Sequence, residues 1–351
     1  MEINTIYEGD NLTILKEFPD KSVDLIYADP PFFSNKHYLV ESKDDIGNRA
    51  FADKWHGGIN SYIEWIKGRL IECKRVLKDT GSIYLHCDYH ANSYLRVLMD
   101  EIFGMNNFRN EIIWQRTHAH GSGTKGFSRV HDTILFYSKT EKFKFNKQYT
   151  PYSKEYIDGF FNYAEPDGRR YQLVIATGPG ETKNDYEWKG KKPSKGRHWA
   201  YNKLRMEELE KERRLIYSKN GVPRVKQYID EKQGTLIPDM WYDIDVIHSN
   251  SKERQKYPTQ KPISLLERII NSASHEGDII LDPFCGCGTT IVAAQKLKRK
   301  WIGIDANSAA CKLMQKRMVE FNIDAPIIKN IKNNNQREIN GYLQSYNPSS
   351  Q

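Results

Sequence analysis

The stretch Asp278–Thr290, DIILDPFCGCGTT, decides the fold of this 351-residue chain. Its first five residues read as a buried strand, and the glycines that follow predict a turn into a helix that starts near Thr289. Such a turn lets the backbone approach a ligand closely. A second strand, KWIGID, ends in Asp305 roughly 20 residues further on, where a carboxylate can hydrogen-bond a ribose diol. The pattern indicates a cofactor that contains a nucleoside. The alternative is a tight connection whose aspartates only cap helices.

Strands and helices alternate from Met1 to about Thr140 and again from about Val246. The first part predicts the strands INTIYE, VDLIYA, SIYLHC, EIIWQR and DTILFYS, with helices over 59–77 and 94–102. The second predicts the helix ISLLERIINSA, the strand DIILD, the helix TTIVAAQKL, the strand KWIGID and a helix from Ser308 to about Phe321. This alternation predicts an α/β fold with a largely parallel sheet covered by helices.

The texture of the sequence also predicts domain boundaries. We expect a core in two halves, 1–140 and 246–325, interrupted by an insertion over 141–245. The insertion is aromatic, basic and rich in glycine, and only its segment MEELEKERR looks strongly helical. The last residues, 326–351, are rich in Asn, Gln and Ser and predict a largely mobile polar tail, although IIKNI could still pack.

Composition narrows the class of protein. Lysine and arginine exceed aspartate and glutamate by 53 − 45 = 8, which fits a polyanionic partner. No run of about 18 apolar residues and no signal-peptide pattern occurs, so we expect a soluble, cytoplasmic protein. The five cysteines lack the spacing of a zinc site and predict reduced, buried thiols. They are Cys73, Cys87, Cys285, Cys287 and Cys311.

A second corner of interest follows the apolar strand VDLIYA, at Asp29-Pro30-Pro31-Phe32. Two prolines fix φ and remove two backbone donors. The Asp29 carboxylate and the Pro30 carbonyl are therefore left as acceptors beside the aromatic face of Phe32. Such a site suits a flat ring that carries an amino group. The alternative is a rigid turn with core phenylalanines.

The segments ADPPF, KYPTQKPISLLERII and LDPFCGCGTT, in this order, resemble the β class of S-adenosylmethionine-dependent DNA amino-methyltransferases. The resemblance covers about residues 3–140 and 246–322. It implies a Rossmann-like methyltransferase mixed sheet with helices on both faces, circularly permuted around a target-recognition region at 141–245. It also implies S-adenosylmethionine as cofactor and double-stranded DNA as substrate, with the target nucleotide flipped out of the duplex.

The resemblance carries over to individual residues. It assigns the catalytic contacts with the target base to Asp29, Pro30, Pro31 and Phe32. Asp282 is expected near the methionine part of the cofactor, Asp305 on its ribose, and Thr259 and Lys261 at the methionine end. Asp10 is expected by the adenine, or equally as a helix N-cap. The glycine loop contributes Phe284, Gly286, Gly288 and Thr289.

Two further segments suggest contacts with DNA. The insertion contains an acid-free basic run with interleaved aromatics, which suits phosphates and bases. Its residues are Lys189, Lys191, Lys192, Lys195, Arg197 and Trp199. The alternative is a solvated loop. The segment RTHAHGSGTKGFSRVHD contains His118, His120 and His131, but no carboxylate or thiol at ligand spacing, so we expect a flexible loop near DNA or cofactor and no metal.

Together these features predict a site-specific DNA methyltransferase acting on the N6 amino group of adenine. The alternatives are N4-cytosine methylation, the same chemistry on RNA or on a protein amide, and a non-catalytic recognition or modification subunit of a restriction complex. The resemblance leaves room for a homodimer and for a cognate restriction endonuclease on another chain.

Overall fold

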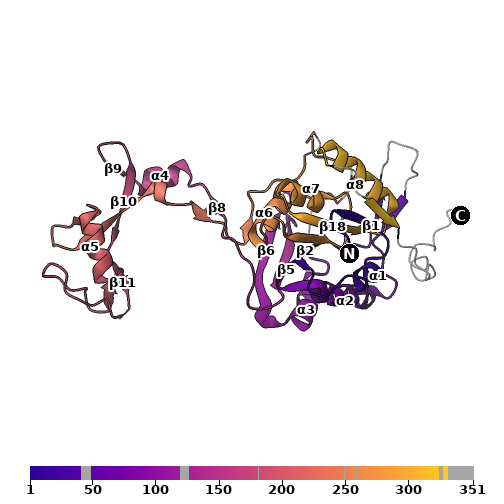
Figure 1. Ribbon diagram of the computed structural model, residues 1–351, viewed down its shortest axis with the longest axis horizontal. Helices are drawn as coiled ribbons and strands as arrows, with labels where there is room; N and C mark the ends of the chain where they lie inside the picture. The colour runs from indigo at the N-terminus through magenta and orange to yellow at the C-terminus, as the bar shows by residue number, and fades with distance from the viewer. Residues whose placement is uncertain are drawn as a thin grey trace, which may run out of the picture. The chain divides into compact units, whose positions relative to one another are not determined.

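The computed structural model describes residues 1–40, 49–118, 126–180, 182–248, 250–255, 257, 259–323 and 327–330 (Figure 1). The chain divides into two compact units, Met1–Asn146 with Pro238–Gln351, and Lys147–Ile237. The expected insertion, 141–245, is longer at both ends than the second unit. Lys144 belongs to the first unit because its Nζ pairs with Asp24 at 2.9 Å, and the Asn146 amide donates to the Ser272 carbonyl at 2.7 Å.

A nine-stranded sheet forms the centre of the first unit, in the order β16-β6-β7-β5-β2-β17-β18-β1-β19. Only β7 runs antiparallel to its neighbours in this sheet. The bounds in sheet order are β16 Met240–Trp241, β6 Phe108–Gln115, β7 His131–Ser138, β5 Leu77–Cys87, β2 Val23–Ala28, β17 Ile279–Asp282, β18 Lys300–Asp305, β1 Thr5–Glu8 and β19 Ile327–Asn330. The mixed α/β sheet predicted from the sequence is confirmed.

Strands from the two ends of the sequence meet at the middle of this sheet. Strand β2 is buried along its whole length, as its unbroken apolar run predicts. It pairs in parallel with β17, with Leu25 opposite Ile280 and Ile26 opposite Leu281. The register brings the carboxyl ends of β2 and β17 to one edge. The permuted order of the motifs therefore has no effect on their proximity in space.

Helices cover both faces of the sheet (Figure 1). On one face lie α1 Asn11–Lys16, α2 Gly58–Val76 and α3 Asn92–Phe103, and on the other α6 Ile263–Ala273, α7 Thr289–Lys296 and α8 Ser308–Glu320. The core repeats the helical spacing seen in the sequence, because Tyr62, Ile66, Leu70 and Cys73 of α2 are all buried against the sheet. A 3-10 turn, Met105–Asn107, and a hairpin of β3 His37–Val40 with β4 Arg49–Ala52 complete the described part of this unit.

The second unit has its own small core around Trp188, Trp199 and Met206. A four-stranded antiparallel sheet in the order β13-β14-β10-β9 carries it. The elements are β8 Tyr149–Thr150, α4 Lys154–Phe160, β9 Tyr163–Ala164, β10 Arg170–Ile175, β11 Thr177–Pro179, β12 Arg197–Trp199, α5 Lys203–Lys211, β13 Leu215–Tyr217, β14 Pro223–Tyr228, a 3-10 turn Ile229–Glu231 and β15 Thr235–Leu236.

Two other expectations meet the structure here. The predicted polar tail begins with an ordered strand, because Ile327–Asn330 pairs in parallel with β1; residues 331–351 lie outside the described residues. All five cysteines are buried and unbridged, as predicted. In the described part of the chain, no helix combines the length and apolar character needed to cross a bilayer.

Candidate active site

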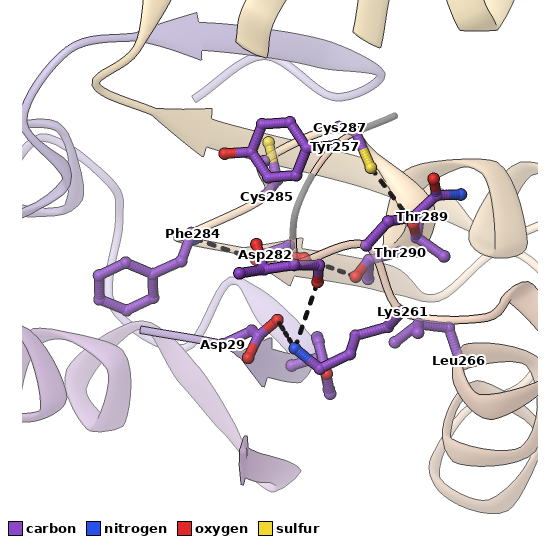
Figure 2. Close-up of a pocket in the computed structure, with 14 residues that line it drawn as sticks. Asp29, Tyr257, Lys261, Leu266, Asp282, Phe284, Cys285, Cys287, Thr289 and Thr290 are labelled. Carbon is purple, nitrogen blue, oxygen red and sulfur yellow. Dashed lines mark hydrogen bonds and ion pairs between the residues drawn. The ribbon is translucent and has the colours of Figure 1, made fainter. Parts of the chain in front are cut away.

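The two corners singled out in the sequence line one cavity at the carboxyl edge of the sheet. Its wall includes Asp29 after β2, Asp282 at the end of β17, the turn 284–287 and the segment around Lys261 (Figure 2). Ligands bind at this edge in open α/β sheets. The adjacency of the Asp29 corner and the glycine turn is thus a property of the strand register.

The Asp29 carboxylate lies at the centre of this arrangement. Its Oδ2 accepts a hydrogen bond from the Lys261 Nζ at 2.6 Å, and the ion pair is largely buried, with side-chain exposures of 15% for Asp29 and 9% for Lys261. Its other oxygen, Oδ1, is buried and has no hydrogen-bond partner among the described residues. Buried polar atoms normally have partners, so Oδ1 is an acceptor that a ligand could satisfy.

The Phe32 ring rests on a rigid, buried support. It stacks on the imidazole of His86, with ring centroids 5.6 Å apart and planes 19° from parallel. His86 is fully buried, with its Nδ1 2.8 Å from the Tyr27 hydroxyl and its Nε2 3.2 Å from Asp132 Oδ2. Burial alone would raise the pKa of Asp132, but the His86 hydrogen bond and the nearby charges of Lys261 and Arg116 lower it. No pattern in the sequence indicates this contact between Phe32 and His86.

A buried carboxylate also fixes the loop after the prolines. Phe33 adopts a left-handed φ of +60°, which is strained for a phenylalanine. Asp53, only 1% exposed, accepts hydrogen bonds from the amides of Phe33 at 3.2 Å and Ser34 at 2.6 Å and from the Trp55 indole at 2.8 Å. These bonds offset the strain and hold the Asp29–Phe32 corner in one conformation.

The glycine turn is shaped by positive φ angles and by Asp305. Gly286 has a φ of +51° and Gly288 a φ of +79°, and a Cβ at Gly288 would lie 2.4 Å from Met314 Cγ. The Asp305 carboxylate accepts from the Gly286 amide at 2.8 Å and from the Asn307 amide at 2.8 Å. Burial raises the pKa of Asp305 although both hydrogen bonds oppose the rise. Asp305 therefore holds the turn, whatever ligand it also binds.

Asp282 is the most perturbed acid at this edge. It is 3% exposed, and burial raises its pKa to about 7, against hydrogen bonds from the Thr290 hydroxyl and the Phe284 amide and with a further rise from the charges of Asp29 and Asp305. No ion pair of Asp282 is found among the described residues. Its protonation state therefore changes near neutral pH.

The raised pKa of Asp282 predicts that ionisation of this carboxyl group lowers the unfolding free energy as pH rises, and that Asp282→Asn removes this effect. Because the folded-state pKa lies above the unfolded value, the folded state binds more protons between roughly pH 4 and 7, and this group's contribution to stability falls as pH rises through that window. We expect the unfolding free energy of the variant to rise by up to about 4 kcal/mol relative to that of the wild type across this pH window. Urea unfolding of both proteins at pH 5, 6, 7 and 8 measures the difference, and parallel curves would contradict the shift.

Asp10 is a helix cap in the structure. It precedes α1, its Oδ2 accepts from the Thr13 amide at 3.0 Å, and its Oδ1 pairs with Arg69 Nη2 at 2.5 Å. Arg69 also donates to Asn11, whose amide group in turn donates to the Pro283 carbonyl at 2.8 Å. This chain of contacts braces the glycine turn from the side of α1 and α2. Its one signal in the sequence is a charged residue on the apolar face of the predicted helix.

The basic run of the second unit divides into exposed and engaged residues. Trp199 is 1% exposed in the core of that unit and donates to the Tyr186 carbonyl at 2.7 Å, so the expected contact of its ring with DNA is corrected to a packing role. Lys189 pairs with Glu210 at 2.6 Å. A carboxylate from outside the run therefore neutralises a lysine in a stretch of sequence that has no acid of its own. The other cations of the run are exposed, as Lys189 is, and they are Lys191, Lys192, Lys195 and Arg197. The Arg197 guanidinium also donates to the Thr177 hydroxyl at 3.0 Å and to the Thr177 carbonyl at 2.9 Å.

Other predicted residues are placed as follows. Thr259 and Thr289 line the cavity, and the half-buried Phe284 packs on Trp65 with ring centroids 5.9 Å apart. Tyr257, which the sequence did not single out, also lines it, against Gly286. His120 lies outside the described residues, and within them no group of three or more His, Cys, Asp or Glu side chains is arranged to hold a metal ion.

A mixed, largely parallel sheet that presents a glycine turn and an acidic corner at one edge is the α/β arrangement that the resemblance to methyltransferases implied. The chain belongs to the DNA methylase family, whose model matches residues 23–316.

Individual relatives agree with this assignment. The type II methyltransferase M.EcaI of Enterobacter cloacae is 32% identical over 299 residues, which are 85% of this chain and 65% of that protein. The DNA adenine methyltransferase YhdJ of Escherichia coli is 28% identical over 321 residues, 90% of this chain and 83% of that protein. A Thermus thermophilus protein, TTHA0409, solved with S-adenosyl-L-methionine, is 17% identical with a TM-score of 0.50 over 94% of this chain and 99% of that chain, a likeness of fold. The chain thus spans about two thirds of the length of M.EcaI.

Proposed function

We propose that this chain transfers a methyl group from S-adenosylmethionine to the N6 amino group of adenine in a flipped-out nucleotide of double-stranded DNA. The observation that carries the proposal is the buried Oδ1 of Asp29, which accepts no hydrogen bond from any residue that the structure describes. An unsatisfied buried acceptor costs about 1–3 kcal/mol, and an exocyclic amino group is a donor that would satisfy it. Membership of the DNA methylase family indicates methyl transfer as the reaction. The Asp29 Oδ1 acceptor favours an amino group as the group that is methylated.

The glycine turn and its acids fit the proposed cofactor. The turn lines the cavity, and beside it the buried carboxylate of Asp282 and the half-buried carboxylate of Asp305 suit a ligand that carries positive charge and hydroxyl groups. Asp305 is the candidate for the ribose, and Asp282 with Phe284 and Thr289 for the remainder. When bound, S-adenosylmethionine supplies an electrophilic methyl group on a sulfonium centre.

Asp29 and its corner are proposed to activate the amine. The lone pair of an aromatic amine is delocalised into the ring, so the nitrogen is a weak nucleophile. Hydrogen bonds accepted by Asp29 and the Pro30 carbonyl favour a more tetrahedral nitrogen, and the carboxylate stabilises the positive charge that develops there. Phe32, fixed on His86, offers a face on which the base can stack. No covalent bond to the protein is needed, which agrees with the raised pKa of the buried Cys285 thiol.

The second unit is proposed as the target-recognition region. Lys191, Lys192, Lys195 and Arg197 are exposed cations that suit phosphates or guanine edges. A homodimer and a restriction endonuclease on another chain stay predictions of the resemblance. The recognised sequence depends on side chains of this unit that carry no transferable motif.

Two observations favour adenine as the target base. An aspartate before the prolines is commoner in the adenine enzymes that this chain resembles, and the relative YhdJ is a DNA adenine methyltransferase. We expect that incubation with tritiated cofactor and duplex DNA, followed by digestion to nucleosides, places the label in N6-methyl-2′-deoxyadenosine. Label in N4-methyl-2′-deoxycytidine would reject adenine and retain the rest of the proposal. Duplexes that contain only A·T or only G·C pairs, beside a mixed-sequence duplex, provide the matched substrates.

A further inference from the structure

Lys261 contacts the proposed catalytic acid, a role that the sequence did not suggest. The resemblance places Lys261 at the methionine end of the cofactor. In the structure its Nζ donates to Asp29 Oδ2 at 2.6 Å (Figure 2). It also lies 3.4 Å from the Thr259 carbonyl and 5.1 Å from the centroid of the Phe32 ring. Residues 232 positions apart are thus joined in one ion pair.

We propose that Lys261 is a positioning residue for Asp29: its hydrogen bond to Oδ2 fixes the orientation of the carboxylate and presents Oδ1 to the amino group of the target base. The inference rests on the proposed function and deepens it. A carboxylate on a single bond can rotate, and a buried partner on one oxygen fixes the direction of the other. Lys261 is 9% exposed on its side chain, so water screens the pair little.

The neighbouring Asp282 occupies the same cavity wall. It receives two hydrogen bonds and has no ion pair among the described residues, and burial raises its pKa to about 7. Asp29 is less buried than Asp282 and accepts a hydrogen bond from the ammonium group of Lys261. Loss of that group would leave two acids side by side in a buried pocket.

The other titratable groups near Asp29 do not replace this cation. Those whose charges interact with it come from β2, α2, β5, β17 and the segment before α6. They are Tyr27, Tyr62, Cys87, Asp282 and Tyr257, besides Lys261. Each of the five is neutral or negative. Removing Lys261 therefore leaves Asp29 without a neighbouring cation among the described residues, and we expect the acid limb of methyl transfer to move to higher pH.

The test compares Lys261→Met, Lys261→Arg and the exposed control Lys142→Met. We expect Lys261→Met to bind S-adenosylmethionine within about threefold of the wild type by calorimetry, but to transfer methyl groups about 100-fold more slowly at pH 7. Its rate should recover toward pH 9, with an acid limb about one pH unit or more above that of the wild type. Lys261→Arg keeps the charge and should restore most of the rate, and Lys142→Met should match the wild type.

Two results would overturn the inference. One is a fall in cofactor affinity of more than about tenfold, which would return Lys261 to the cofactor site. The other is an equal loss of rate at every pH.

Label transfer to DNA by the wild-type protein distinguishes failure of the proposed function from failure of the inference about Lys261. If the wild-type protein transfers no label to DNA, a stability cycle of Asp29→Asn, Lys261→Met and the double variant still tests the pair. We expect the double variant's unfolding equilibrium constant to differ by at least about tenfold from the product of the single effects. Additivity would contradict the pairing.

Discussion

Asp29→Ala should lower the rate of methyl transfer by about 10³-fold while leaving the affinity for S-adenosylmethionine within about threefold of the wild type. The carboxylate is proposed to act only on the amine, and the stabilisation of developing charge by one preorganised group is typically of this size. Single-turnover transfer to duplex DNA gives the rate, and calorimetry gives the affinity.

The matched control is Asp20→Ala, which removes an exposed aspartate from the same unit. It should leave both quantities unchanged. If Asp29→Ala abolished cofactor binding together with transfer, activation of the amine would be the wrong role. A fold that fails outright is recognised by circular dichroism, and Asp29→Asn, which keeps the volume, then replaces it in the comparison.

The second large effect is expected at the glycine turn. Gly288→Ala must place a Cβ 2.4 Å from Met314 Cγ at a φ of +79°, so it adds a clash to backbone strain. We expect a loss of about 3 kcal/mol or more in unfolding free energy. Cofactor affinity should fall with it, because the turn lines the cavity.

Gly277→Ala separates the two causes. Gly277 has nearly the same φ, +83°, but nothing lies within 4 Å of its added Cβ. It should cost only the strain of a left-handed alanine, about 1 kcal/mol. Urea unfolding measures both variants. Equal losses would show that the contact with Met314 contributes nothing.

Much of the fold could be predicted because local pattern and tertiary structure agree. The apolar run of β2 is continuous because both faces of that strand are covered, and the spacing of Tyr62, Ile66 and Leu70 follows the buried face of α2. Strand β16 is only Met240–Trp241, and two residues carry no period to detect. For that reason the sequence predicts the end of the insertion at residue 245, whereas the second unit ends at Ile237.

The site was predictable where a motif is contiguous and not where it depends on contacts between distant segments. The Asp29 corner and the glycine turn are short stretches with recognisable chemistry. Three interactions form only on folding. They are the hydrogen bond from the Ser34 amide to Asp53, the hydrogen bond from Arg69 to Asn11 and the ion pair of Lys261 with Asp29. Trp199 looked like a DNA contact because sequence shows an aromatic among lysines but not which side of a strand faces the core.

The proposed reaction requires that a single cleft brings the cofactor and the amino group of the base together. A pulse–chase experiment tests this requirement: the protein is loaded with methyl-tritiated S-adenosylmethionine, a large excess of unlabelled cofactor is added together with duplex DNA, and the DNA is digested to nucleosides. We expect protein-bound label to appear in an N-methylated base before it exchanges, and we expect Asp29→Ala to load equally but to deliver none. Label that leaves unreacted from the wild type, or that stays on the protein, would contradict it.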